Sequence, residues 1–216
     1  MKDYFIQLSC AFSSDKFTQK AYVSEGQERA NQYVDGLNSF FNFYSKYQED
    51  YSNIYIVDNT LEDKSKVNPK ILETIPNGVN YIFSNENTYG KNNKGSGCIE
   101  QWISCESVLH DYEYVWFSSS RSQYRDFSFY ETFIKSPTNL FRKWHAGQFF
   151  TNSFFIESKT ALEYIKYRTP KSLSDNHICF EADLYDFLNE NSIKYKFLEN
   201  IGINWNDEFT NTVREL

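Results

Sequence analysis

Polar side chains of the kinds that bind nucleotides follow two apolar segments in the first third of the chain. Ser9 comes directly after YFIQL, and Asp58 comes after NIYIV. The carboxylate of Asp58 can accept a hydrogen bond from a ribose hydroxyl or a base N–H. Asp is also common in ordinary turns, where its side chain caps the backbone. A turn residue is therefore the alternative interpretation of Asp58.

A segment rich in Gly, Asn and Lys follows the next apolar segment and reads NENTYGKNNKGSG, residues 85–97. Gly95 and Gly97 would let the backbone approach a ligand closely, and Lys94 adds positive charge where the segment opens into a helix. Asn87 belongs to the same segment. These features predict a diphosphate-binding loop. Neither GxxxxGK[ST] nor GxGxxG is present, so an ordinary flexible loop is the alternative.

A run of three serines and an arginine follows the apolar segment YEYVWF. The run comprises Ser118, Ser119, Ser120 and Arg121. A guanidinium can pair with a phosphate through two parallel hydrogen bonds, which makes Arg121 a candidate phosphate ligand. The alternative is a surface arginine in a serine-rich turn.

Acidic residues near the C-terminal third are candidates for proton transfer. Glu181 and Asp183 stand near the start of a predicted amphipathic helix. Glu181 is the first candidate for a general base that deprotonates a hydroxyl, and Asp183 is the second. The alternative is that both are first-turn acids, favoured there by the helix dipole. His145, Thr151 and Asn152 are candidates for the acceptor side of a site, although a lone His is more often structural.

The hydrophobic pattern alternates between strand-like and helix-like segments. Strands are expected at residues 4–12, 53–57, 80–83, 112–117, 149–156 and 195–198, and helices at 27–47, 70–75, 98–109, 159–167 and 180–189. This alternation predicts an α/β fold with a mainly parallel, Rossmann-like central sheet and helices on both faces. We expect one domain over residues 1–216, with a short polar tail from about 204. In such sheets ligands bind at the carboxyl ends of the strands, where the polar residues above are found.

Taken in order, IYIVDNT, NTYGKNNKGSGCIEQW, DYEYVWFSSSR and GQFFTNSFFI resemble bacterial GT-A-type glycosyltransferases of capsule and lipopolysaccharide assembly. The resemblance extends from about residue 4 to residue 188. It implies a donor that is a nucleotide-diphospho-sugar, most often with uridine, and a glycan or lipid-linked acceptor. It places Ser9 and Asp58 beside the nucleoside. It places a further set beside the sugar-diphosphate, namely Asn87, Lys94, Gly95, Gly97 and Arg121.

The sequence departs from that family at one position. The family usually carries Asp-x-Asp after the central strand to hold Mg²⁺ or Mn²⁺, whereas this chain has Ser118, Ser119 and Ser120. Hydroxyl groups are poor ligands for these cations, so a divalent metal lacks its usual ligands here. Three outcomes remain open: metal-independent transfer with Lys94 and Arg121 neutralising the diphosphate, a carboxylate recruited from elsewhere, or loss of catalysis.

Composition limits the classes of partner. The chain has 216 residues and a formal net charge of −7, which disfavours binding to nucleic acid through bulk charge. The first residues do not read as a signal peptide, and no apolar run reaches about 18 residues. We therefore expect a cytoplasmic protein, at most in peripheral contact with the inner membrane face. The aromatic content of 19% reflects either coding bias or a surface that stacks on sugars.

Three functions are consistent with these observations. The first is glycosyl transfer in surface polysaccharide synthesis. The second is a non-catalytic sugar-nucleotide-binding domain of the same fold. The third is a sugar-phosphate nucleotidyltransferase. Enzymes of that class resemble one another in a Gly-rich loop after the first strand, and SCAFSSDK, residues 9–16, contains no glycine.

Overall fold

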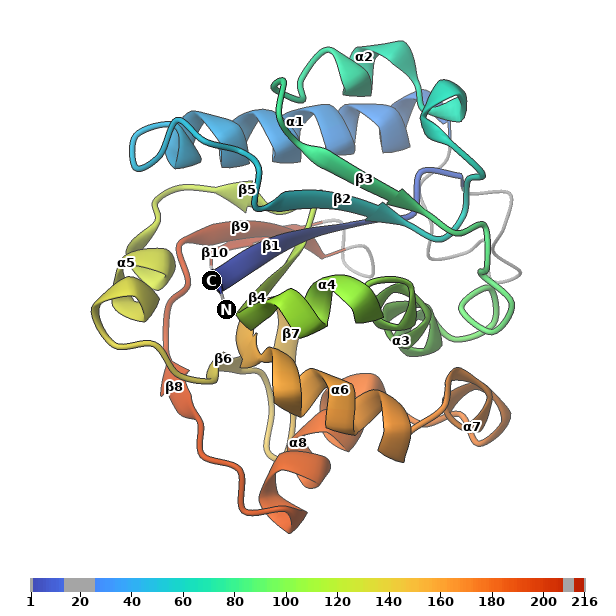
Figure 1. Cartoon of the computed structure of the whole chain (residues 1–216), viewed down its shortest axis with the longest axis vertical. Helices are drawn as coiled ribbons and strands as arrows, with labels where there is room; N and C mark the ends of the chain where they lie inside the picture. Colours follow the sequence, from blue (N-terminus) through green and yellow to red (C-terminus); the bar gives the residue numbers. More distant parts are fainter. Residues whose placement is uncertain (1, 14–25, 208–211, 216) are drawn as a thin grey trace.

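The computed structural model describes residues 2–13, 26–207 and 212–215. A seven-stranded sheet runs through its centre in the order β3-β2-β1-β4-β7-β6-β8 (Figure 1). Its strands are β1 Lys2–Cys10, β2 Ile54–Asp58, β3 Asn80–Phe83, β4 Tyr112–Ser119, β6 Leu140–Lys143, β7 Phe149–Glu157 and β8 Lys196–Leu198. Among these seven strands β7 alone runs opposite to the others. The expected mainly parallel α/β sheet is therefore confirmed.

Helices cover both faces of this sheet (Figure 1). On one face lie α1 Gly26–Tyr44, α2 Pro69–Leu72 and α5 Ser128–Lys135. On the other lie α3 Lys94–Ser104, α4 Glu106–Asp111, α6 Ser158–Tyr167, α7 Pro170–Asp175 and α8 Phe180–Glu190. A short 3-10 helix, η3, spans Lys64–Lys66. In the described residues no helix combines the length and the apolar character that a membrane crossing requires.

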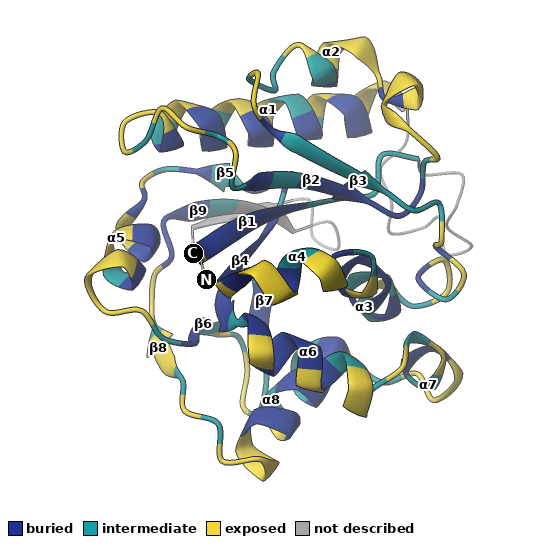
Figure 2. Cartoon of the chain, in the orientation of Figure 1, coloured by how far each residue is buried: buried dark blue, intermediate teal, exposed yellow. Residues whose placement is uncertain are grey.

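Each face of the sheet has its own hydrophobic core, because side chains alternate along a strand. Tyr4, Ile6 and Leu8 of β1 point into the core under α1, whereas Phe5 points into the core under α3. Figure 2 shows the buried side of the helices turned toward the sheet. Aromatic residues fill both cores, and Trp116 and Trp102 are fully buried, one on each face. These buried aromatics serve packing rather than a sugar-binding surface.

Helix α3 begins four residues earlier than the pattern predicted and ends earlier too. The Asn93 side chain accepts a hydrogen bond from the Ser96 N–H at 3.1 Å and so caps the helix at Lys94. The predicted helix at 98–109 is in fact two helices, α3 and α4, which meet at Cys105. The segment expected to be a loop up to Gly97 therefore already contains the first turn of α3.

Several elements were not predicted. They include α5, β6, α7 and a small antiparallel sheet of order β10-β9-β5, whose strands are Thr212–Glu215, Ile203–Asp207 and Gln123–Tyr124. The stretch that the sequence predicted to be a short polar tail thus contains β9 and β10. Ile203 of β9 is buried against the core under α1, which anchors this stretch to the rest of the domain.

Candidate functional site

A pocket of about 190 Å³ opens at the carboxyl ends of β1 and β4. Ser9 of β1 and Ser119 of β4 are register partners on its floor. Because β7 runs antiparallel to β4, the beginning of β7 reaches the same edge and contributes Thr151 and Asn152. The N-termini of α3 and α8 complete the wall with Lys94, Gly95, Gly97, Cys98, Phe180 and Glu181. The pocket lies at the edge of the sheet where the strands carry their carboxyl ends, as expected from the sequence.

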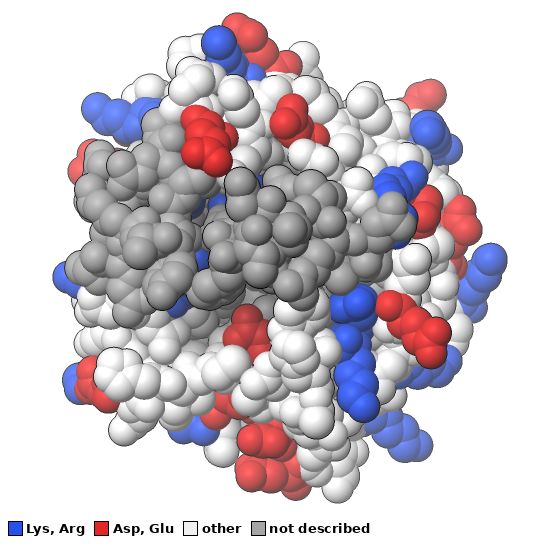
Figure 3. All heavy atoms as spheres, turned by 180° about the vertical axis from the view of Figure 1, so that it is seen from behind, with Lys and Arg blue, Asp and Glu red and all other residues white. Residues whose placement is uncertain are grey.

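Three basic side chains line this pocket against one acidic side chain among the described residues. Arg121 donates to the side chain of Gln32 in α1 at 3.0 Å, and Lys94 lies at the start of α3. Arg29 of α1 is 4% exposed and donates from Nε to the Ala11 carbonyl at 2.8 Å. Elsewhere, on the face shown in Figure 3, basic and acidic side chains are interspersed. The pocket is therefore suited to an anion despite the net charge of −7.

The N-terminus of α3 adds the positive end of a helix dipole to these cations. Asn93 caps the helix, and its amide nitrogen also donates to the carbonyls of Leu173 and Ile178, each at 3.2 Å. These bonds fix the first turn, with Gly95 and Gly97, against the pocket. The positive end of a helix dipole favours a phosphate. The predicted loop residues Asn87, Lys94, Gly95 and Gly97 all line the pocket.

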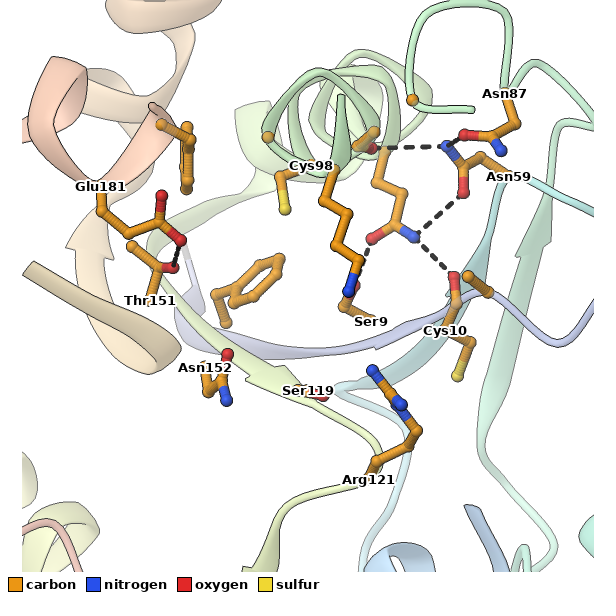
Figure 4. A pocket seen from close by; sticks show the side chains of 18 of the residues that line it. Ser9, Cys10, Asn59, Asn87, Cys98, Ser119, Arg121, Thr151, Asn152 and Glu181 are labelled. Atoms are coloured by element: carbon orange, nitrogen blue, oxygen red, sulfur yellow. Dashed lines mark hydrogen bonds between the residues drawn. The ribbon is translucent and has the colours of Figure 1, made fainter. Parts of the chain in front are cut away.

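A buried amide network beneath the pocket was not anticipated from the sequence. The Gln101 side chain accepts from the Ser9 hydroxyl at 2.5 Å and donates to the Cys10 carbonyl at 2.6 Å (Figure 4). It also donates to Asn59 at 3.3 Å, and Asn59 in turn donates to Asn87 at 3.2 Å. Gln101 therefore ties the end of β1 to the loop that holds Asn87. The segment GCIEQW contains Gln101, but nothing in that string marks it as a pocket residue.

Glu100 holds the same loop from the other side of α3. Its buried carboxylate accepts from the backbone N–H groups of Tyr89 at 2.8 Å and Gly90 at 3.1 Å. Burial raises the pKa of Glu100, and these hydrogen bonds oppose that rise in part. Glu100 is absent from the pocket wall, so its contribution is to the shape of the loop.

Asp58 does not line the pocket. It is 1% exposed, and its carboxylate accepts from the backbone N–H groups of Phe12 at 2.7 Å, Thr60 at 2.7 Å and Leu61 at 2.8 Å. These bonds hold the turns after β1 and β2 together. The position supports the turn interpretation rather than direct contact with a nucleoside.

The three serines after the central strand have different surroundings. Ser118 is buried against Tyr124, and Ser120 donates to the Ser9 carbonyl at 2.9 Å, so Ser119 alone of the three faces the pocket. Among the described lining residues the one carboxylate is Glu181, and no described group of three His, Cys, Asp or Glu residues could hold a metal. This set of donors does not fit a Mg²⁺ or Mn²⁺ ion.

Glu181 lies on the pocket wall opposite Asn59 and Asn87 (Figure 4). The Thr151 hydroxyl donates to its Oε1 at 3.0 Å, and the Cys179 thiol donates to its Oε2 at 3.1 Å. A carboxylate therefore shares the cavity with the cationic side chains of Arg29, Lys94 and Arg121. This is the arrangement expected if a proton acceptor and a departing anion share one site.

The structure does not bring Asp183 or His145 to the pocket. Asp183 forms an ion pair with Arg168 at 2.5 Å and accepts from the Tyr164 hydroxyl at 2.7 Å, so it joins α8 to α6. His145 is exposed beside Trp144, with their rings 4.8 Å apart. The interpretation of Asp183 as the reserve base and of His145 as an acceptor residue is therefore not supported by their positions.

Comparison with solved structures shows which fold this is. A cytidylyltransferase from Leptospira borgpetersenii serovar Hardjo-bovis matches with a TM-score of 0.54 and 10% identity, over 93% of this chain and 77% of that chain. A protein from Desulfovibrio desulfuricans named as a nucleotide-diphospho-sugar transferase matches with a TM-score of 0.52 and 10% identity, over 92% and 80%. No protein-family profile and no curated sequence matches. At this identity the likeness establishes the fold, and the activity must be argued from the pocket.

Proposed function

We propose that this chain is a glycosyltransferase that moves a sugar from a nucleotide-diphospho-sugar, UDP-linked in the first instance, to a glycan or lipid-linked acceptor of surface polysaccharide synthesis. One observation carries the proposal. Lys94, Arg121 and the N-terminus of α3 line the same pocket as the carboxylate of Glu181. The similarity to a nucleotide-diphospho-sugar transferase fold supports it.

The chemistry follows from these lining residues. The acceptor hydroxyl oxygen attacks the anomeric carbon, and the bond from that carbon to the diphosphate oxygen breaks. Lys94 and Arg121 stabilise the negative charge that gathers on the departing diphosphate. In an inverting transfer, Glu181 takes the proton from the acceptor hydroxyl. The described pocket residues do not supply the ligands of a metal, and in this scheme Lys94 and Arg121 neutralise the diphosphate instead.

Product analysis tests the proposal. Wild-type protein is incubated with UDP-sugars and glycan or lipid-linked acceptors, and nucleoside diphosphate release and the mass of the acceptor are measured. We expect Glu181→Gln to bind the donor as the wild type does and to lose transfer. Glu163→Gln, which alters an exposed glutamate of α6, serves as the matched control with full transfer. Full transfer by Glu181→Gln would remove Glu181 as the base.

A sugar-phosphate nucleotidyltransferase is the second candidate, because the fold is equally similar to a cytidylyltransferase. Against it, residues 9–16 after β1 contain no glycine. The two candidates differ in the bond that breaks: a nucleotidyltransferase releases pyrophosphate from a nucleoside triphosphate. Pyrophosphate formation from CTP and a sugar phosphate would replace the first proposal with this one.

A non-catalytic sugar-nucleotide-binding domain is the third candidate, and Ser118, Ser119 and Ser120 at the usual Asp-x-Asp position are the observation that favours it. It predicts tight binding of the donor with neither transfer nor hydrolysis. Binding without turnover over the whole acceptor panel would select this candidate.

A further inference from the structure

The orientation of the Gln101 side-chain amide is fixed by a neighbour that can only accept a hydrogen bond. Gln101, on α3, is 4% exposed, and one end of its amide lies 2.6 Å from the Cys10 carbonyl oxygen (Figure 4). A carbonyl has no proton to give, so this end of the amide is the nitrogen, Nε2. The other end is therefore the oxygen, Oε1, and it lies 2.5 Å from the oxygen of the Ser9 hydroxyl.

A second carbonyl fixes the same orientation independently. The Asn59 amide lies 3.4 Å from the Gly97 carbonyl oxygen, so the nitrogen of Asn59 faces Gly97. Its oxygen, Oδ1, then lies 3.3 Å from Gln101 and can only accept, which again requires the nitrogen of Gln101 at that point. Both carbonyls therefore direct Oε1 of Gln101 at Ser9.

This orientation determines the direction of the hydrogen bond at Ser9. An amide oxygen can only accept, so Ser9 must donate its single hydroxyl proton to Gln101. Ser9 is half-buried and lines the pocket, which leaves its oxygen within reach of a ligand. That oxygen can still accept a hydrogen bond through its lone pairs, but it has no second proton to give. Ser9 is thus an acceptor toward a ligand in the pocket.

The parts of a nucleoside diphosphate differ in what they offer to such an acceptor. The oxygens of an ionised phosphate accept hydrogen bonds and have no proton to give. A ribose hydroxyl and a base N–H group can both donate. Lys94 and Arg121 of the same pocket are donors and suit the phosphates, whereas Ser9 suits the nucleoside.

We propose that Gln101 is a positioning residue that sets the specificity of Ser9. Gln101 holds the Ser9 proton away from the ligand, so that Ser9 recognises a hydrogen-bond donor of the nucleoside, a ribose hydroxyl or a base N–H, and not the diphosphate. The proposal rests on the proposed function only in that a nucleotide occupies the pocket. It gives a physical reason for the expected place of Ser9, and it adds Gln101, which the sequence did not indicate.

Binding of nucleotide analogues, measured by calorimetry, tests the direction of this bond. The tightest ligand among UDP, CDP and GDP is compared with its 2′-deoxy and 3′-deoxy analogues and with the analogue methylated at the base N–H. We expect one analogue to bind wild type about tenfold more weakly than the parent, because Ser9 then has no donor opposite it. In Ser9→Ala this penalty should vanish, and the analogue concerned identifies the donor as ribose or base. If every analogue kept its wild-type penalty in Ser9→Ala, the proposal would be overturned.

Gln101→Met tests the positioning role through the same penalty. Without Oε1 the Ser9 proton is no longer held away from the ligand, so the penalty should fall from about tenfold to about threefold or less. A merely structural role would weaken parent and analogue alike and leave the penalty unchanged, and that result would overturn the role of Gln101. The control is Ser104→Ala on α3, outside the pocket wall, where another half-buried serine hydroxyl donates to the Glu100 carbonyl at 2.9 Å. It should bind every ligand as the wild type does.

These binding measurements separate the proposal from the proposed function. Ser9→Ala is expected to fold, since Gln7 also donates to Oε1 of Gln101, at 3.4 Å, and keeps its orientation. If the penalty depended on Ser9 but no sugar were transferred, glycosyl transfer would fail as the function and this proposal would stand. If sugar were transferred but no penalty depended on Ser9, this proposal alone would fail. Binding of no nucleotide by the wild type would overturn both.

Discussion

At the scale of single residues, the pocket combines side chains that the sequence could indicate with others that it could not. Lys94 belongs to the predicted Gly-rich loop, Arg121 follows a predicted strand and Glu181 lies near the start of a predicted helix, and all three line the cavity. Arg29 and Gln101 reach it only because α1 and α3 pack beside the end of β1. Their contacts join residues that are far apart in the chain, and no local pattern reports such contacts.

Glu100 makes stability depend on pH in a direction opposite to that of a paired surface carboxylate. Burial raises its pKa above the ordinary value of 4.5. Between pH 4.5 and the raised pKa of Glu100 in the folded protein, the unfolded chain has released a proton that the folded protein still holds. The free energy of unfolding therefore falls as the pH rises through this range. Glu100→Gln removes this dependence. We expect the stability of the variant relative to wild type to increase as the pH is raised from about 4.5.

Urea unfolding of both proteins at a series of pH values above 4.5 measures the effect. Glu163→Gln, at an exposed position of α6, is the control and should run parallel to wild type. If the difference between Glu100→Gln and wild type stayed constant with pH, the burial argument for Glu100 would be wrong.

Asp183 is expected to matter for stability and not for the nucleotide. Arg168→Ala leaves the buried Asp183 carboxylate without its ion pair. The cost should be about 3 kcal/mol, at the low end for buried pairs because Arg168 is partly exposed. Denaturant unfolding measures it, with Lys171→Ala, which breaks the exposed pair with Asp175, as a nearly neutral control. A neutral Arg168→Ala would contradict the structural role of the pair.

At the scale of elements, the position of α3 decides whether Lys94 and the helix dipole reach the pocket. The sequence indicated a Gly-rich segment leading into a helix, but Asn93 determines where the helix starts. α5 and β6 were missed because short elements carry too few apolar positions for their period to stand out. The long strands β1, β4 and β7 were predicted because their apolar runs are unambiguous.

Substitution by alanine is expected to have different effects on stability at Gly95 and at Gly97. A Cβ on Gly95 would lie 2.5 Å from the Cβ of Phe180, so α3 and α8 could not keep their contact. A Cβ on Gly97 would lie no nearer than 3.4 Å to any neighbour, an ordinary contact. Gly95→Ala should therefore destabilise by about 1–3 kcal/mol. Gly97→Ala should be neutral or stabilise by up to about 1 kcal/mol, because Ala favours helix.

Thermal unfolding of the two variants measures this difference. Equal stability of Gly95→Ala and Gly97→Ala would show that Gly95 is not needed for the close packing of α3 against α8, and would leave the ligand as the reason for glycine there.

At the scale of the whole molecule, the alternation of strands and helices was sufficient to predict the fold class. It did not predict the function, because the same fold is shared by a cytidylyltransferase and a nucleotide-diphospho-sugar transferase. What favours an anionic ligand is local: an acidic chain concentrates basic groups in its pocket. That contrast predicts selective binding of a diphosphate at one place on the molecule.

The most direct test is thermal unfolding of wild type and Arg121→Ala with UDP, CDP and GDP, their sugar conjugates and CTP, with and without EDTA. We expect one diphosphate series to stabilise wild type, by about 2.7 kcal/mol at a hundred times its dissociation constant. This gain in stability should be much smaller in Arg121→Ala, and EDTA should not change it. The control Lys159→Ala, which alters an exposed lysine of α6, should keep the full gain. Two results would contradict a diphosphate-binding pocket. In the first, no diphosphate stabilises the wild type. In the second, a diphosphate stabilises Arg121→Ala as much as it stabilises the wild type.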